Sequence, residues 1–367
     1  MSTVHSDPKL RLRRGSPVPH LQDNGRSATA TEPRSEPMSR LATLLGVQVL
    51  GTGGYTPDVR VHNEDLSALG CDPEWIVQRS GISERRHAPT EQASGDLAYE
   101  AAIRCIDSAG VDPADIDLLI VGTITPDRQI PSTACELQDR LGLRCPSMDI
   151  AAACAGFMYS SVTAMQFIHS GASRHALVVA SDVLTRVVDP KDKRTYPLFG
   201  DGAGAALLGR GDENQGFLAY TLGSDGAGAD QLCIPGGGSR EPLTAESIAA
   251  GDQYLYMDGR SIFKWAVRTI HTSCYDVLDH AGLTVDDIDW VMLHQANSRI
   301  LDAAVEDMGL DRHKVLLNLD RYGNTSAASI PLVLDEAARD GLLTQGDRIL
   351  MCGFGAGLTW GTGILQW

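Results

Sequence analysis

A pattern that occurs once in each half of the chain limits the fold more than any other feature of the sequence. Residues 109–121 read AGVDPADIDLLIV, and residues 281–293 read AGLTVDDIDWVML. A second pair, GDGAG at 200–204 and GFGAG at 353–357, occurs in the same order. Each long copy indicates a helix end, an Asp-rich turn and a short apolar strand. The sequence therefore predicts a duplicated α/β unit, with independently arisen turn chemistry as the alternative.

Short apolar runs in both halves are typical of strands that helices cover on both faces of a sheet. These runs are 118–121, 177–180, 290–293 and 349–351. We expect a layered α/β protein with an N-terminal half at 44–215 and a C-terminal half at 216–367. Residues 1–43 contain few large apolar side chains, and we expect them to form a disordered extension. An organellar transit peptide or a misplaced start codon are alternatives for this segment.

Composition excludes several classes of function. The formal net charge of −16 argues against nonspecific nucleic-acid binding. No apolar stretch is long enough to span a bilayer. The eight cysteines are scattered without CxxC spacing, so neither a disulfide framework nor a metal site is indicated. The sequence predicts a cytoplasmic protein that has no nucleic-acid or membrane partner.

Cys154 is the candidate nucleophile. It lies in the run AAACAGF at 151–157, before a helix-compatible stretch. Small residues suit a strand-to-helix turn that brings backbone and nucleophile close together. The positive end of the helix dipole is expected to make the thiolate more accessible near neutral pH. The alternative is a buried cysteine that serves as a small hydrophobic side chain.

Two other segments supply polar groups at the ends of buried elements, where layered α/β proteins tend to place their sites. His294 ends an apolar, strand-like run, and Asn324 lies in the turn-forming sequence YGNTS at 322–326. A core histidine and a turn asparagine are the alternatives for the single residues. Together with Cys154 they form a candidate catalytic group.

Four motifs carry a family resemblance: AAACAGF, LHQAN at 293–297, GNTSAAS at 323–329 and GFGAGLTWG at 353–361. In this order they resemble the β-ketoacyl-acyl-carrier-protein synthase III family of the thiolase superfamily. The resemblance extends from about Val47 to Trp367. It implies the thiolase fold, in which two similar halves form α-β-α-β-α layers with the active site between them. It also implies a homodimer and no metal or redox cofactor.

The resemblance implies a two-part reaction that initiates fatty-acid synthesis. The Cys154 thiolate would take the acyl group of a short acyl-CoA, while the backbone N–H groups of Cys154 and Ala356 bind the oxyanion. Malonyl-acyl-carrier protein would then lose CO₂, and its enolate would attack the acyl-enzyme to give 3-oxoacyl-acyl-carrier protein. His294 and Asn324 would donate hydrogen bonds to the malonyl thioester oxygen.

The resemblance assigns further residues to substrate contacts. The residues implied to bind CoA are Trp75, Arg79, Lys193 and Arg194, with Lys193 in a position that is arginine in the best-known members. The cations implied to bind the carrier protein are Lys264, Arg268 and Arg299. Ile130 matches the position that closes the acyl pocket of the partner subunit. An ordinary solvated charge is the alternative for each carrier-binding cation. A core tryptophan and a surface arginine are the alternative for Trp75 and Arg79.

Other members of the superfamily compete with this assignment. Elongating synthases use a second histidine, which the GNTS sequence does not supply. Biosynthetic thiolases use a second cysteine, and Cys352 lies one residue before the required position, so we interpret it as a buried strand residue. Chalcone-synthase-like enzymes and starter-unit synthases of secondary metabolism share Cys-His-Asn and stay open. A thioester hydrolase using Cys154 and His294, or a noncatalytic scaffold, is less compatible with all three polar groups.

Overall fold

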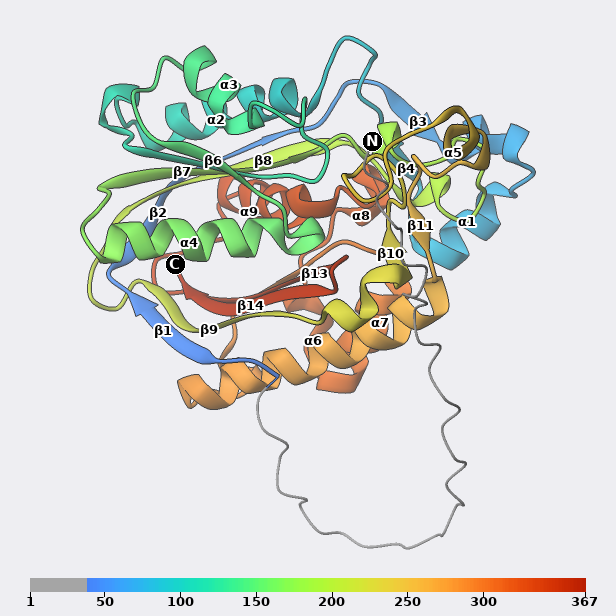
Figure 1. Cartoon of the computed structure of the whole chain (residues 1–367). Coiled ribbons are helices and arrows are strands. Elements are labelled where there is room, and N and C mark those ends of the chain that lie inside the picture. The colour runs from blue at the N-terminus through green and yellow to red at the C-terminus, as the bar shows by residue number, and fades with distance from the viewer. Residues whose placement is uncertain (1–37) are drawn as a thin grey trace, which may run out of the picture. The chain divides into compact units, whose positions relative to one another are not determined.

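The computed structural model describes residues 38–367. Within them, two five-stranded sheets alternate with three layers of helices (Figure 1). This α-β-α-β-α arrangement is the fold that the family resemblance implied, while the sequence pattern alone predicted a layered α/β protein. The disordered extension predicted for residues 1–43 lies outside the described residues, except for its last part. There the prediction was wrong, because strand β1 spans Leu41–Leu45.

The first sheet belongs to the N-terminal half and has the order β2-β8-β7-β5-β6. Strand β5 is parallel to β6 and β7, while β8 is antiparallel to β7 and β2. Every residue of β5 is buried, as its unbroken apolar sequence requires. The strands are β2 Val47–Tyr55, β5 Leu118–Gly122, β6 Ser147–Ile150, β7 His175–Asp182 and β8 Gly202–Arg210.

The second sheet has the order β1-β9-β14-β13-β12. Strand β12 is parallel to β13, and the other neighbouring pairs are antiparallel. Strand β1 pairs with β9, so the start of the described chain joins the sheet of the C-terminal half. The other strands are β9 Gly216–Ser224, β12 Trp290–Leu293, β13 Arg348–Gly355 and β14 Thr359–Gln366.

Helices cover both faces of each sheet, and apolar side chains fill the space between the layers. The helices α4 (Gly156–His169) and α9 (Ser329–Arg339) lie between the sheets and build the central core cluster. Each fully buried Leu, Ile or Val contributes roughly 1.5–3 kcal/mol to folding. The outer helices are α2 Ser94–Ala109 and α3 Thr133–Arg140 on the first sheet, with α6 Gly259–Ala281 and α7 Ser298–Met308 on the second.

The structure confirms the duplication read from the sequence. Helix α2 leads through the 3-10 turn at Pro113–Asp115 into β5, and α6 leads through the turn at Val285–Asp287 into β12. The second motif pair leads into β8 in one half and precedes β14 in the other, and each of these strands lies two strands away from the duplicated strand, β5 or β12. Its two copies are not in register, because 200–204 overlaps β8 whereas 353–357 ends before β14 begins.

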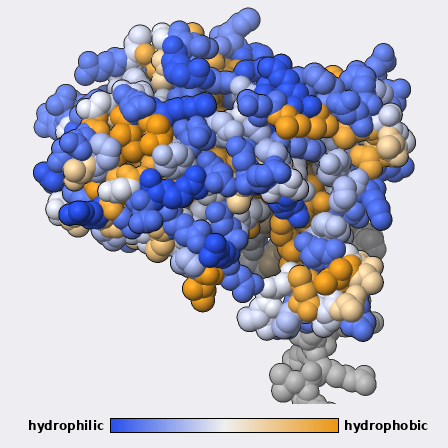
Figure 2. Space-filling view, turned by 90° about the horizontal axis from the view of Figure 1, so that it is seen from above, coloured by the Kyte–Doolittle hydropathy of each residue, from blue (hydrophilic) through white to orange (hydrophobic). Residues whose placement is uncertain are grey.

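The remaining elements gather at one end of the layers (right side of Figure 1). They are β3 Arg60–His62, α1 Pro73–Ser80, β4 Glu84–Arg86, β10 Leu232–Cys233, α5 Ala245–Ala250, β11 Tyr256–Met257 and α8 Leu319–Tyr322. Hydrophilic residues cover most of the face above α2 and α3, with separate hydrophobic patches between them (Figure 2). Among residues 38–367, no helix is both long and apolar enough to cross a membrane.

Candidate active site

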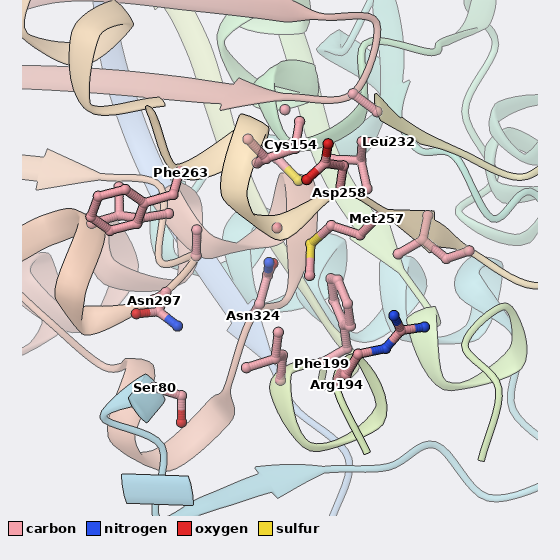
Figure 3. Close-up of a pocket in the computed structure, with 18 of the residues that line it drawn as sticks. Ser80, Cys154, Arg194, Phe199, Leu232, Met257, Asp258, Phe263, Asn297 and Asn324 are labelled. Carbon is pink, nitrogen blue, oxygen red and sulfur yellow. The ribbon is translucent and has the colours of Figure 1, made fainter. Parts of the chain in front are cut away.

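A cavity of about 840 Å³ opens between the two halves, and Cys154, His294 and Asn324 all line it. Figure 3 shows Cys154 and Asn324 in this cavity. Cys154 comes from the N-terminal half, and the other two come from the C-terminal half. The walls around them are mainly apolar and include Phe199, Leu255 and Phe354. Three separate segments therefore bring a thiol, an imidazole and an amide to one enclosed space.

The nucleophile lies in a tight turn between β6 and α4. Residues Ala153–Ala155 form a 3-10 turn, and α4 begins at Gly156. Ala153 has φ 44°, a left-handed conformation that costs an alanine about 1 kcal/mol or more. A Cβ atom at Gly355 of β13 would lie 2.9 Å from the backbone N of Cys154, so only glycine fits there. The predicted strand-to-helix turn is thus confirmed, and its small residues are needed for close approach.

The protonation of Cys154 differs from the sequence-based expectation. Burial raises the pKa of its thiol to about 12, and the Ser326 hydroxyl, which faces the thiol, lowers it by less. The nearby carboxylate of Asp182 raises the pKa further. The helix dipole was expected to make the thiolate more accessible near neutral pH, whereas burial, the largest effect at this site, moves the thiol pKa in the opposite direction. Attack by Cys154 therefore requires a group that accepts its proton.

His294 follows directly after β12, and three neighbours hold its backbone and its ring. Its backbone N–H donates to the Cys352 carbonyl of β13 at 2.8 Å. Its Nδ1 lies 2.6 Å from the Ser329 hydroxyl at the start of α9. The Phe354 ring packs edge-on at a centroid distance of 5.1 Å. Burial lowers the pKa of His294 to about 3, so the imidazole is neutral at physiological pH.

Asn324 is held by hydrogen bonds along its backbone and through its side-chain oxygen. Its N–H donates to the Leu198 carbonyl at 2.8 Å, and its carbonyl accepts from Gly200 N at 3.0 Å. Its Oδ1 accepts from the backbone N–H of Ser326 at 2.8 Å. Because a backbone N–H requires an acceptor, this contact assigns the amide oxygen to the Ser326 side. The Nδ2 donor is therefore left for the cavity, and Figure 3 shows the Asn324 side chain pointing into it.

A buried carboxylate joins the two halves beneath the site. Asp182 at the end of β7 accepts hydrogen bonds from Ile124 N at 2.9 Å and from Ala327 N at 3.3 Å. Burial raises the pKa of this carboxyl, while these donors oppose the rise. The contact also braces Ser326, whose φ of 52° is strained for a serine. Asp182 therefore connects the loop that carries Asn324 to the first sheet, whose strand β6 leads to Cys154.

Cys154 and Ala356, the two residues predicted to form an oxyanion hole, both line the cavity. Ala356 follows β13 and lines the cavity next to Gly355. The Thr359 hydroxyl lies 2.8 Å from the Ala356 carbonyl and 3.0 Å from the Ala152 carbonyl. This hydroxyl therefore links the glycine-rich loop to the nucleophile turn.

Most predicted substrate contacts lie along the same cavity. Its lining includes Trp75, Arg79, Lys193, Arg194, Lys264 and Arg299. The Arg79 guanidinium lies 5.3 Å from the centre of the Trp75 ring, one helical turn away on α1. Arg194 is held by Asp192 at 3.0 Å, so its charge is partly engaged.

Two predicted residues do not line the cavity. Arg268 is exposed on α6, one turn beyond Lys264, which does line the cavity. Ile130 is 85% exposed and does not reach the cavity of its own chain.

Cys352 is fully buried on β13 and accepts a hydrogen bond from the Thr362 hydroxyl at 3.1 Å, as expected for a strand residue. Residues 38–367 contain no group of three or more His, Cys, Asp or Glu placed to hold a metal ion.

Sequence reasoning missed several residues of the site. Arg260 lines the cavity on the first turn of α6, and its spacing of four from Lys264 was the signal that would have found it. Asn297 also lines the cavity and caps α7 by accepting from Arg299 N at 2.9 Å. Ser329 had no signal of its own, since a serine near a helix start is common.

The duplicated α/β halves and the cysteine-lined cavity between them define a protein of the thiolase fold. Models of 3-oxoacyl-[acyl-carrier-protein] synthase III and of its C-terminal part match residues 148–226 and 278–367. A β-ketoacyl-[acyl-carrier-protein] synthase III from Rhodopirellula baltica is 54% identical over 345 residues, which cover 89% of this chain and 100% of that protein. The chain belongs to the β-ketoacyl-[acyl-carrier-protein] synthase III family.

Two solved structures place the fold in the same group. The 3-oxoacyl-[acyl-carrier-protein] synthase III from Aquifex aeolicus is 38% identical with a TM-score of 0.81, and the match covers 88% of this chain and 100% of that one. The priming β-ketosynthase from the R1128 polyketide biosynthetic pathway is 36% identical with a TM-score of 0.82, covering 90% and 98%. The family resemblance carried by the four sequence motifs is thereby confirmed.

Proposed function

We propose that the protein condenses a short acyl-CoA with malonyl-acyl-carrier protein, with loss of CO₂, to give 3-oxoacyl-acyl-carrier protein and initiate fatty-acid synthesis. One observation carries this proposal: Cys154, His294 and Asn324 line a single cavity that also contains Trp75 and Arg79. Covalent capture, enolate stabilisation and CoA binding thus have groups of the right chemistry in one space.

In the first half-reaction, the sulfur of Cys154 attacks the acyl thioester and CoA leaves as a thiolate. The backbone N–H groups of Cys154 and Ala356 donate to the oxyanion of the tetrahedral intermediate. The packing of Gly355 against the nucleophile turn supports this pairing, because it holds the two backbone segments together. The acyl chain then lies against apolar walls that include Leu184 and Phe199.

In the second half-reaction, malonyl-acyl-carrier protein enters the same cavity and loses CO₂. The resulting enolate oxygen is stabilised by Asn324 Nδ2 and His294, and the enolate carbon attacks the acyl-enzyme. The fixed orientation of the Asn324 amide supports this role. No metal or redox cofactor takes part in this scheme, since an electrophilic thioester and two hydrogen-bond donors suffice for each step.

The substrates and the acidic carrier protein enter past a set of cations. Trp75 and Arg79 suit stacking on the CoA adenine and pairing with its phosphates, and Lys193 and Arg194 extend this region. Lys264 and Arg299, with Arg268 farther out, form a local basic area on a chain of net charge −16. Such an area steers an acidic partner despite the overall charge.

We also propose that the enzyme is a cytoplasmic homodimer. Ile130 is 85% exposed and does not line its own cavity, which supports a role in closing the acyl pocket of a partner subunit. Strand β6 is an edge strand with one side unpaired in the single chain. Sedimentation equilibrium would test the dimer, and a monomer would contradict it.

The activity is tested with purified protein, radiolabelled acetyl-CoA and malonyl-acyl-carrier protein. We expect labelled 3-oxoacyl-carrier protein and stoichiometric CO₂, both lost in Cys154→Ala. Release of free acetate without condensation would support a thioester hydrolase instead. A starter-unit synthase is the second candidate, favoured by the match to the priming polyketide ketosynthase. A higher kcat/KM for longer acyl-CoAs than for acetyl-CoA would support it.

A further inference from the structure

A chain of hydrogen bonds behind His294 decides which ring nitrogen carries the proton. His294 Nδ1 lies 2.6 Å from Ser329 Oγ, and Ser329 Oγ lies 2.7 Å from the Ser326 carbonyl oxygen. A hydroxyl has one hydrogen, and a carbonyl can only accept. The Ser329 hydrogen is therefore committed to Ser326, and the contact with the ring requires a hydrogen on Nδ1.

The carbonyl of Ser326 can take part in this chain without losing another bond. It also accepts the backbone N–H of Ser329, and a carbonyl oxygen has two lone pairs for two donors. The opposite assignment, in which Ser329 donates to Nδ1, would remove the 2.7 Å bond, since the hydroxyl cannot donate twice. Ser329 and Ser326 are both at most 1% exposed, so water does not replace that bond.

We infer that Ser329 is a positioning residue that holds His294 with its hydrogen on Nδ1, so that the resting cavity contains a proton acceptor at Nε2. The inference rests on the proposed function for its catalytic meaning. His294 is 2% exposed and neutral, so no second ring proton is present at rest. The imidazole cannot donate to an enolate in this state, and it first has to take up a proton.

The proton transfers balance over one turnover. As sulfur bonds to the acyl carbon, the Cys154 thiol proton moves to His294 Nε2 and from there to the sulfur of the leaving CoA, which is the stronger base. One solvent proton enters with the malonyl carboxylate and is held on Nε2, and the imidazolium donates Nε2–H to the malonyl thioester oxygen while CO₂ leaves. When the enolate carbon attacks, the C–S bond to Cys154 breaks, and the thiolate recovers its proton from Nε2. One solvent proton is consumed, which matches the loss of a carboxylate as CO₂.

The Ser329 contact stabilises the imidazolium as well as the resting tautomer. The positive ring donates Nδ1–H to Ser329 Oγ, which passes its own hydrogen to Ser326. Hydrogen bonds to a charged group are stronger than those between neutral groups. Burial raises the pKa of the Cys154 thiol and so opposes the loss of its proton. Ser329 assists this step by stabilising the imidazolium that receives the proton.

The tautomer is measured directly by nitrogen NMR on the full-length protein labelled with ¹⁵N-histidine. The chain has ten histidines, so the His294 signals are identified by their loss in His294→Gln. We expect a protonated Nδ1 and a bare Nε2 in the resting wild type. A protonated Nε2 with a bare Nδ1 would overturn the inference.

Variants of Ser329 test the positioning role by the rate of acetyl transfer from acetyl-CoA to Cys154. In Ser329→Ala we expect this rate to fall by about 10- to 100-fold, because the imidazolium loses its partner. Ser329→Thr keeps the hydroxyl and should stay within about threefold of wild type. Ser160→Ala is the matched control, since Ser160 Oγ is buried without a hydrogen-bond partner among the described residues.

Two outcomes distinguish this inference from the proposed function. Wild-type acetylation rates in Ser329→Ala would overturn the positioning role. If Ser329→Ala does not fold, the tautomer of the wild type and the rate of Ser329→Thr still decide it. A wild type with the expected tautomer and normal acetylation that does not condense with malonyl-acyl-carrier protein would refute the proposed function alone.

Discussion

Substitutions of Asn324 can distinguish its structural role from its catalytic role, because the amide oxygen holds the loop and the amide nitrogen faces the cavity. Oδ1 accepts the Ser326 N–H at 2.8 Å and holds the loop, whereas Nδ2 faces the cavity. Asn324→Ala removes both groups. Asn324→Asp keeps an oxygen for Ser326 but replaces the donor with a second oxygen, so it is the matched control for stability.

The magnitudes follow from this geometry. Loss of one oxyanion donor in a comparable site costs roughly 10²–10³ in turnover. Asn324→Ala also leaves the buried Ser326 N–H without a partner, which costs about 1–3 kcal/mol of unfolding free energy. Asn324 is 7% exposed, so water compensates little. We expect both variants to lose condensation, and only the alanine variant to lose stability through this contact.

The assay measures the two half-reactions separately and adds chemical denaturation. Transfer of radiolabelled acetyl to Cys154 should stay within about threefold of wild type, because the first oxyanion is bound by backbone groups. Decarboxylation of malonyl-acyl-carrier protein should fall in both variants. If Asn324→Asp decarboxylates at the wild-type rate, or if acetyl transfer falls as much as decarboxylation, the assigned role of Nδ2 is refuted.

Three further predictions concern other parts of the site. Gly355→Ala places a methyl group 2.9 Å from Cys154 N, so the first-order rate of acetyl transfer should fall at least about tenfold, and an unchanged rate would contradict the packing argument. Arg260→Gln should raise KM for acyl-CoA or malonyl-carrier protein several-fold with kcat unchanged, and the effect should shrink as salt increases. The pKa of His294 is lowered to about 3, so below pH 6.5 the unfolded state binds the extra proton and stability falls as pH decreases towards 3. Chemical denaturation at several pH values gives the free energy of unfolding of wild type and of His294→Gln. Below pH 6.5 this free energy should change with pH less steeply in the variant, by up to about 1.4 kcal/mol per pH unit. Equal slopes would argue against a buried neutral imidazole.

The sequence predicted the layers because the information is local. In residues 109–121 a helix end, a turn and an apolar strand follow one another, and each is set by nearby side chains. Strand β1 was missed because its partner β9 lies far along the chain, and the short stretch Leu41–Leu45 has a weak pattern of its own. Pairing over such a distance depends on the folded sheet and leaves little trace in one strand.

The site was predictable in its chemistry but not in its protonation. The cysteine, the histidine and the asparagine each stand in a recognisable motif, and the structure places all three at one cavity. The pKa of Cys154 depends on how many protein atoms surround the sulfur, which no motif records. The bond between Ser329 and His294 joins residues from α9 and the end of β12, so it exists only after the two pack together.

Strand β13 touches the nucleophile and the imidazole with opposite faces. Gly353 and Gly355 approach the Cys154 turn, while Phe354 between them contacts the His294 ring. Successive residues of a strand point to opposite sides, so one extended backbone contacts both reacting groups and fixes their spacing along the cavity that they share. Loop insertions elsewhere leave that spacing unchanged, so descendants of such a chain can acquire new primers by altering the distant walls while inheriting the same bond-forming centre.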